Sequence, residues 1–397
     1  MPLGVLVAAL VAAAAVVGHV AFVGSMLLAV VAAVSVFASL TLATFMTALL
    51  SHSRLLRDDP SYLTIRRMAF EVHLSGRYSD NLSGMPKDDG LLKIGISQCL
   101  LGAEVRYDGG HKRNSVVVDL LSPVFSWVPV CPEVESGMGV PREPVALQAS
   151  GSETRMVGAE SGTDHTESMD RFTVKKLDDL AEVPLRGYIL KSGSPSCGKQ
   201  VPVEGGEQAP GIFARALADR FPALPTVEET ELADPGARQN FAERVFAYDR
   251  QQKFFTSQRS VGQLVMSHAQ VKLQLDAHRP GLHAEVAEVF KQAKDLSYEE
   301  LGNRYLAAMM DALKVPATPA GHFAVLKTVF EAVKKDVEPA VQKELARSLQ
   351  DYRQGNVPLA VPLTLLRHYV RVHENPHFNQ QTYLEPEPKE LLLRTQV

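Results

Sequence analysis

The amino-acid sequence predicts an α/β fold, in which a small, mostly parallel sheet domain is followed by an all-α helical domain. Between about residues 93 and 254, short apolar runs alternate with segments of helical periodicity, and this alternation is typical of a parallel sheet. After residue 260 the apolar residues recur at helical spacing only. A further observation is that each strand-like run leads into a cysteine.

The composition excludes several classes of protein. The 397 residues are 46% hydrophobic and 22% charged, with a formal net charge of −4, so the chain is long enough for two or three domains with cores of their own. No long run of Lys and Arg is present, and therefore no nucleic-acid partner is predicted. Three cysteines in a chain of this length do not form a disulfide framework. They are of interest as thiolates.

The chain starts with an apolar segment, residues 1–53, that contains no charged side chain before Arg54. As a helix it would be about 80 Å long, enough to cross a bilayer twice. One interpretation is therefore a transmembrane hairpin that anchors the protein, with the catalytic part in the cytoplasm. The other is a misassigned start, with translation beginning near Met85 and a purely cytoplasmic protein. A membrane partner is expected only if residues 1–53 are genuine. Residues 54–91 are interpreted as a linker.

The sheet domain is predicted over residues 92–255. Its strands are short buried runs, and the loop over 132–144 is long, polar and rich in Glu, Gly and Pro. The expected strands are 93–99, 125–131 and 186–191, and the expected helices are 115–122, 166–181, 211–221 and 236–254.

The three cysteines, Cys99, Cys131 and Cys197, lie at or just after these strand ends. The loops that follow the carboxyl ends of parallel strands share one edge of the sheet, where ligands bind. A structural zinc site usually needs four ligands, often in close C-x-x-C pairs, whereas three thiolates suit an iron–sulfur cluster with one open iron. The alternative is three inert buried thiols.

Three separated motifs carry a resemblance to a known family, the thiouracil desulfidase-like domain that was formerly a domain of unknown function. The motifs are KIGISQCLLG (93–102) with VRYDGGHK (105–112), VCPE (130–133) with GVPR (139–142), and LKSGSPSCG (190–198).

The resemblance implies a cofactor and a reaction. It assigns Cys99, Cys131 and Cys197 as ligands of a [4Fe-4S] cluster, whose fourth iron can take a sulfur atom from the substrate. The implied enzyme is a desulfidase that acts on a small thiolated nucleobase or a related thiocarbonyl compound. It converts C=S to C=O by hydrolysis, without net redox change. The open alternative is a cluster-bearing sensor or binding protein that acts through its helical domain.

Some group must move protons in such a reaction, and Glu133, two residues from Cys131, is the first candidate for the general base or acid. Ser194 could orient the water or a ring heteroatom. Glu135 is a second carboxylate in the same loop, and is interpreted as a solvated loop residue.

Four further residues are candidates for binding the substrate: Asp108, Lys112, Arg142 and Ser196. Lys112 could bind an anionic group, but it could equally be a solvated surface residue. Asp108 and Arg142 could instead form an ion pair that braces the loops.

Residues 256–397 resemble the YbgA-type helical domain that is often fused behind the sheet domain. His268 and Lys272 match part of its motif, as do residues 362–369 and 383–386. The helices are expected at 260–277, 281–293, 297–314, 320–335, 338–354 and 363–373.

Overall fold

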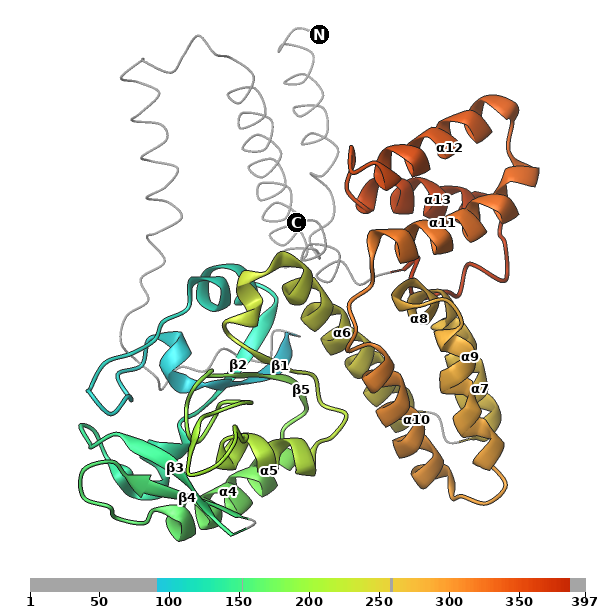
Figure 1. Cartoon of the computed structure of the whole chain (residues 1–397). Helices are drawn as coiled ribbons and strands as arrows, with labels where there is room; N and C mark the ends of the chain where they lie inside the picture. Colours follow the sequence, from blue (N-terminus) through green and yellow to red (C-terminus); the bar gives the residue numbers. More distant parts are fainter. Residues whose placement is uncertain (1–90, 152, 258–259, 386–397) are drawn as a thin grey trace, which may run out of the picture. The chain divides into compact units, whose positions relative to one another are not determined.

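The computed structural model describes residues 91–151, 153–257 and 260–385 (Figure 1). The apolar segment 1–53, with its expected transmembrane hairpin, lies outside the described residues, and so does nearly all of the expected linker. Within the described ranges, no helix combines the length and the apolar character that crossing a bilayer requires.

The first part of the described chain is α/β, as predicted. Its main sheet has four strands in the order β2-β1-β5-β7, and every neighbouring pair is parallel. The three predicted strands are present, whereas the short fourth strand was not predicted. The strands are β1 (Leu92–Ser97), β2 (Phe125–Val130), β5 (Leu185–Leu190) and β7 (Thr226–Glu228).

A second sheet, with strand order β4-β3-β6, was also not predicted. Strands β3 (Val145–Ser150) and β4 (Glu153–Gly158) form an antiparallel hairpin, and β6 (Val203–Glu204) pairs with β3. The sequence signal is weak because Leu147 is the one fully buried residue of β3, so the apolar alternation that marks a strand does not develop.

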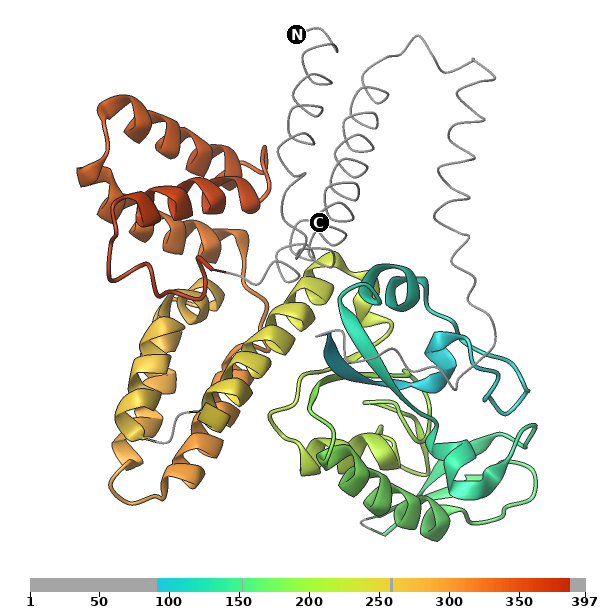
Figure 2. The same ribbon diagram turned by 180° about the vertical axis from the view of Figure 1, so that it is seen from behind.

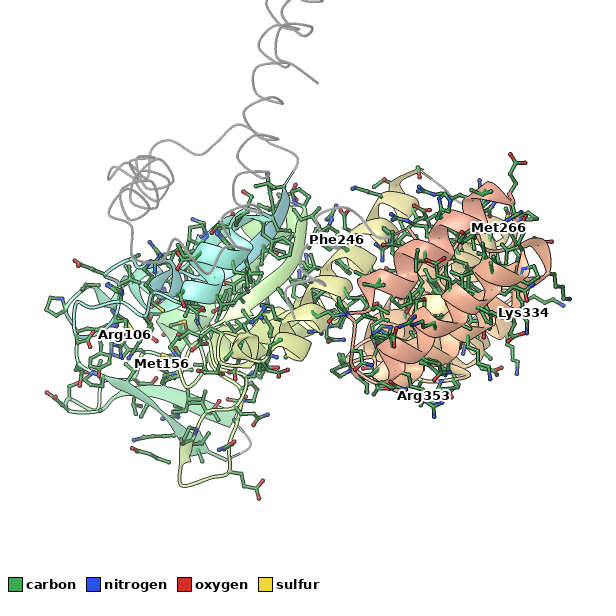
Figure 3. All side chains as sticks on the ribbon, turned by 90° about the horizontal axis from the view of Figure 1, so that it is seen from above. Arg106, Met156, Phe246, Met266, Lys334 and Arg353 are labelled. Atoms are coloured by element: carbon green, nitrogen blue, oxygen red, sulfur yellow. The ribbon has the colours of Figure 1, made fainter. Side chains whose placement is uncertain are left out.

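Helices cover both faces of the main sheet (Figures 1 and 2). One face packs on α6, which carries Phe246 (labelled in Figure 3). The ring of Phe246 lies against that of Phe125, with a centroid distance of 6.2 Å. The other face packs on α4 and α5 through residues such as Leu177 and Phe213. The helices are α4 (Thr166–Ala181), α5 (Ile212–Arg220) and α6 (Pro235–Ser257).

Short helical turns occur where the sequence predicted a helix and a loop. The helix expected over 115–122 is a π-type turn, and the expected loop over 132–144 contains a second one. The turns are η1 (Gln98–Leu101), η2 (Val116–Leu121), η3 (Val134–Met138) and η4 (Glu231–Ala233).

The second part of the described chain is helical, as predicted. The helix expected over 260–277 is interrupted at Val271, because the carbonyls of Ala269 and Gln270 accept hydrogen bonds from Gln381 and Thr382 instead of continuing the helix. The helices are α7 (Val261–Gln270), α8 (Lys272–His278), α9 (Leu282–Ala287), α10 (Tyr298–Ala312), α11 (Pro319–Val333), α12 (Pro339–Arg353) and α13 (Ala360–Val372), with the turns η5 (Glu288–Gln292) and η6 (Lys334–Asp336).

Candidate active site

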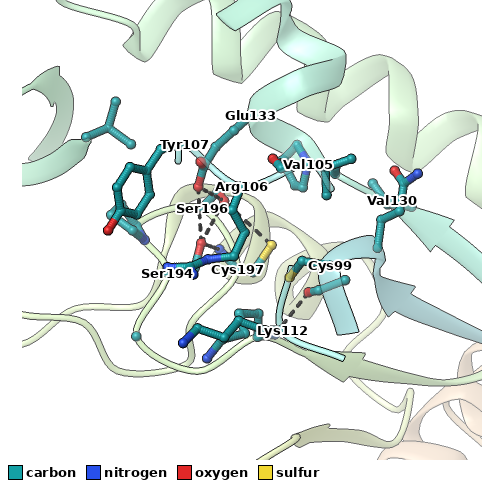
Figure 4. Close-up of a pocket in the computed structure, with 18 of the residues that line it drawn as sticks. Cys99, Val105, Arg106, Tyr107, Lys112, Val130, Glu133, Ser194, Ser196 and Cys197 are labelled. Carbon is teal, nitrogen blue, oxygen red and sulfur yellow. Dashed lines mark hydrogen bonds between the residues drawn. The ribbon is translucent and has the colours of Figure 1, made fainter. Parts of the chain in front are cut away.

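All three cysteines line one pocket of about 330 Å³ at the carboxyl edge of the main sheet. Cys99 follows the end of β1, Cys131 follows β2 directly, and Cys197 lies in the loop after β5. Figure 4 labels Cys99 and Cys197 among the residues that line this pocket. The parallel topology thus brings together residues that are far apart in the sequence, while the role of the thiols stays a prediction.

Burial keeps these thiols protonated as long as no metal centre is bound in the pocket. It raises the pKa of Cys99 to about 11, with a further contribution from the nearby Cys131, and it raises the pKa of Cys197 to about 12. The pKa of Cys131 is raised too, again mainly by burial. Because three thiolates in one buried pocket repel each other, the thiolate state requires bound positive charge, as a metal centre provides.

The chemistry of the donors around the pocket is that of a cluster site. Within the described part of the chain, no three His, Cys, Asp or Glu side chains are arranged around one point as ligands of a metal ion. In an iron–sulfur cluster each cysteine binds a different iron, so the ligand sulfurs stand farther apart than they do around one ion. Three soft thiolates around one pocket therefore fit a [4Fe-4S] cluster with one iron free of protein ligands.

Glu133 lies beside Cys197, at the centre of a hydrogen-bonded group (Figure 4). Its Oε2 pairs with the guanidinium of Arg142. Its Oε1 accepts hydrogen bonds from the hydroxyls of Ser196 at 2.9 Å and Ser194 at 3.2 Å. The two hydroxyls are 3.0 Å apart, and the hydroxyl of Ser196 is 3.6 Å from the sulfur of Cys197. The group can exchange protons next to the cysteines.

Arg142 joins the loops that carry this group. Its Nη1 donates hydrogen bonds to the carbonyls of Val105 at 3.1 Å and Gly139 at 2.9 Å, besides the ion pair with Glu133. Its side chain is buried to the same degree as a core residue, at 7% exposure. The contacts of Arg142 position Glu133.

Asp108 is not brought into the site. Its carboxylate is 3.2 Å from the guanidinium of Arg106 and accepts a hydrogen bond from the backbone N–H of Gly110. The hydrogen bond from Gly110 lowers the pKa of Asp108 most, and Arg106 lowers it further. The suggested ion pair between Asp108 and Arg142 is therefore wrong. Asp108 does not line the pocket, whereas the other candidate site residues do.

Lys112 lies at the rim of the pocket with an exposed side chain. Its backbone N–H donates to the carbonyl of Cys99 at 2.9 Å (Figure 4), which fixes the rim to the β1 loop. Tyr107, which was not predicted as a site residue, also lines the pocket and is 38% exposed.

Sequence reasoning also missed a partly buried ion pair at the edge of the pocket. The ammonium of Lys191 is 2.6 Å from Glu229, which also accepts hydrogen bonds from the N–H and hydroxyl of Ser192. Lys191 follows β5 directly and lowers the pKa of Cys99, against the larger effect of burial. The position of Lys191 at a strand end could have identified it as a residue of the pocket edge. Its partner Glu229 could not be found in this way, because Glu229 follows β7, which was not predicted.

Glu135 is exposed, in agreement with its interpretation as a solvated loop residue, and it also has two partners. Its Oε1 accepts a hydrogen bond from the N–H of Cys131 at 2.9 Å, and its Oε2 is 2.6 Å from the ammonium of Lys176 in α4. Glu135 therefore fixes the Cys131 loop to α4, on the outside of the pocket.

Comparison with known proteins gives matches for both parts of the chain. Residues 94–229 match a family model described as 2-thiouracil desulfurase, and residues 272–388 match one described as a protein of unknown function, DUF1722.

Two curated relatives match one part each. The uncharacterized protein YbbK of Bacillus subtilis (strain 168) is 31% identical over 147 residues, which are 35% of this chain and 97% of YbbK. The uncharacterized protein YbgA of Escherichia coli (strain K12) is 25% identical over 155 residues, which are 38% of this chain and 90% of YbgA. Among solved structures, the [4Fe-4S]-dependent thiouracil desulfidase TudS is 35% identical, with 36% of this chain and 93% of TudS covered and a TM-score of 0.31.

Proposed function

The chain belongs to the 2-thiouracil desulfurase family, and we propose that it removes sulfur from a thiolated nucleobase, or a related thiocarbonyl compound, by hydrolysis. The observation that carries this proposal is the pocket in which three thiols meet the carboxylate of Glu133. In the proposed reaction the carbon–sulfur double bond is replaced by a carbon–oxygen double bond. Water supplies the oxygen, sulfur leaves as sulfide, and no electrons are gained or lost.

Cys99, Cys131 and Cys197 are the residues that would hold the [4Fe-4S] cluster. When bound, the cluster supplies an iron without a protein ligand, which suits the soft sulfur of a thiocarbonyl and polarises the carbon–sulfur bond. Glu133 is a poor candidate for an iron ligand, because its carboxylate is a hard donor and both of its oxygens already have partners.

Glu133 is proposed as the general base that takes a proton from the attacking water. The ion pair with Arg142 holds one carboxylate oxygen and leaves the other facing Ser194 and Ser196. The bond from Ser194 is the longer of the two, so this hydroxyl can turn towards the water or a ring atom of the substrate. Ser196 keeps its bond to Glu133 and preserves the orientation of the carboxylate.

The pocket of about 330 Å³ is at the lower end of the size range of small-molecule sites. Because it would hold the cluster as well, the space that is left suits a small substrate such as a single-ring nucleobase. The half-exposed ring of Tyr107 offers a flat surface at the pocket wall. The ammonium of Lys112, exposed at the rim of the pocket, could attract an anionic substituent of the substrate.

The proposed function is tested by metal removal. The full chain, purified without oxygen and reconstituted with iron and sulfide, is expected to convert 2-thiouracil to uracil and sulfide in equal amounts. The same protein after chelation of its iron is expected to lose this activity and to regain it on reconstitution, because the three thiols alone cannot polarise the substrate. Protein with a full complement of iron that turns over neither 2-thiouracil nor other thiolated pyrimidines would contradict the proposal.

A further inference from the structure

The Cys197 loop (residues 191–199), which carries Ser194 and Ser196, is bonded at its start to a carboxylate outside the pocket. This carboxylate belongs to Glu229, which follows the edge strand β7, does not line the pocket and is 7% exposed. Burying a charged group is costly unless the group is paired and hydrogen-bonded. The proposed function does not use Glu229, so its burial needs another explanation.

Glu229 and Lys191 together bind every polar group of Ser192. The backbone N–H of Ser192 donates to Oε2 of Glu229 at 2.7 Å, and its hydroxyl donates to Oε1 at 2.8 Å. The ammonium of Lys191, which is 2.6 Å from Oε1 of Glu229, donates to the carbonyl of Ser192 at 2.7 Å. The backbone N–H of Lys191 in turn donates to the hydroxyl of Ser97 at the end of β1, at 2.9 Å. The start of the Cys197 loop is therefore fixed to two strands of the sheet.

Only Gly193 separates Ser192 from Ser194. Gly193 has a φ of +66°, in the left-handed region that glycine adopts most easily, so the chain turns sharply there. The hydroxyl of Ser194 is 3.2 Å from Glu133, which is long for a hydrogen bond from a hydroxyl. The place of this hydroxyl therefore depends on the backbone of Ser194, which is held by Ser192 before it and by the N–H of Gly198, 2.8 Å from its carbonyl.

The end of the Cys197 loop is held by a different carboxylate. Oε1 of Glu228, the last residue of β7, accepts a hydrogen bond from the backbone N–H of Lys199 at 2.7 Å. The ammonium of Lys199 is 2.8 Å from Glu231. Glu229 thus acts on the part of the loop that leads to Ser194, whereas Glu228 acts on the part that follows Cys197.

We propose that Glu229 is a positioning residue, which sets the place of the Ser194 hydroxyl against Glu133 by fixing Ser192. This inference rests on the proposed function, in which Ser194 orients the attacking water or a ring atom of the substrate. A displacement of about 1 Å in a site can lower the rate about 10²-fold. Glu229 therefore acts on turnover from outside the pocket.

The test compares Glu229→Gln with Glu228→Gln, which remove the same charge at neighbouring residues. Glutamine has one acceptor oxygen and one NH₂ group, so at position 229 its NH₂ meets another donor, either the N–H of Ser192 or the ammonium of Lys191. At position 228 the amide oxygen can still accept from the N–H of Lys199. After reconstitution with iron and sulfide, both variants are expected to contain normal iron. Glu229→Gln is expected to lower kcat by up to about 10²-fold, and Glu228→Gln to leave it unchanged.

The Ser194→Ala variant separates positioning from a structural effect. If Glu229 acts through the Ser194 hydroxyl, Glu229→Gln is expected to lower kcat in the unchanged chain and to have little further effect when residue 194 is alanine. A general loss of folded protein would instead lower kcat by the same factor in both. Ser192→Ala removes one bond to Glu229 and leaves the charge pair. It is expected to show a smaller loss with the same dependence on Ser194, and it decides the question if Glu229→Gln does not fold.

Hydrogen exchange of the apoproteins tests the contacts independently of activity. Glu229→Gln is expected to speed up exchange of the backbone N–H of Ser192, whose acceptor is replaced, and to leave exchange at Lys199 unchanged. Glu228→Gln is expected to change neither. The measurement is residue-resolved deuterium uptake by mass spectrometry.

Four results would overturn the inference and leave the proposed function intact. They are unchanged exchange at Ser192 in Glu229→Gln, unchanged kcat despite faster exchange, an equal loss of kcat with serine and with alanine at residue 194, and loss of iron from the folded variant. If the unchanged chain, with full iron, turns over no thiolated pyrimidine, the proposed function is contradicted and this inference fails with it, whatever the exchange at Ser192.

Discussion

Replacing Cys99, Cys131 or Cys197 by alanine is expected to remove the cluster and to reduce desulfidase activity to background. Each thiol is proposed to bind a different iron, so none can take over the role of another, and the described pocket holds no fourth thiol. The measurements are iron and acid-labile sulfide per chain, the brown absorbance of the cluster, and turnover of 2-thiouracil.

The folded state of the cysteine variants serves as the control. Because the three thiols are free and burial keeps them protonated without a metal, alanine should leave the apoprotein folded, with circular dichroism like that of the unchanged apoprotein. A triple alanine variant that still binds stoichiometric iron would show that the cluster is held elsewhere.

Glu133→Gln is expected to lower turnover by about 10² to 10⁴ while iron content stays normal, since this is the usual effect of removing a positioned general base. Glutamine keeps the size of the side chain. Its amide oxygen can still accept from Arg142, and its amide N–H can donate to the hydroxyl oxygen of Ser196, so the loop should keep its structure. The measurement is the rate of uracil formation at saturating 2-thiouracil, per bound cluster.

Glu135→Gln is the matched control, because Glu135 lies in the same loop but bonds to the N–H of Cys131 and to Lys176, outside the pocket. Its turnover is expected to stay close to that of the unchanged protein. Normal turnover by Glu133→Gln would place the base elsewhere, and loss of its iron would mean that Glu133 supports the cluster instead.

The main sheet could be predicted from the sequence because its three longer strands are short segments rich in apolar residues. Residues of β1 such as Ile94 and Ile96 are fully buried against α6, and the topology rules then place the strand-end cysteines at one edge. The hairpin of β3 and β4 could not be predicted, because polar residues such as Gln148 and Arg155 are exposed on it and few apolar ones are buried.

For the site, too, some features could be predicted from the sequence and others could not. Glu133, Ser194 and Ser196 were found because short motifs carry them next to cysteines, and the structure brings all three within hydrogen-bond distance of each other. Contacts between distant segments were missed: Asp108 pairs with Arg106 rather than Arg142, and Lys191 pairs with Glu229. Local sequence does not specify which charged side chain meets which across loops of the fold.

The central claim is that the three-cysteine pocket replaces sulfur by oxygen from water. It is tested most directly by a reaction of the cluster-loaded chain with 2-thiouracil in ¹⁸O-labelled water, without added reductant or oxidant, followed by mass spectrometry of the product. The account predicts uracil that carries one ¹⁸O atom, with one sulfide released for each uracil formed. Uracil without the label, or turnover that requires an electron donor or acceptor, would contradict it.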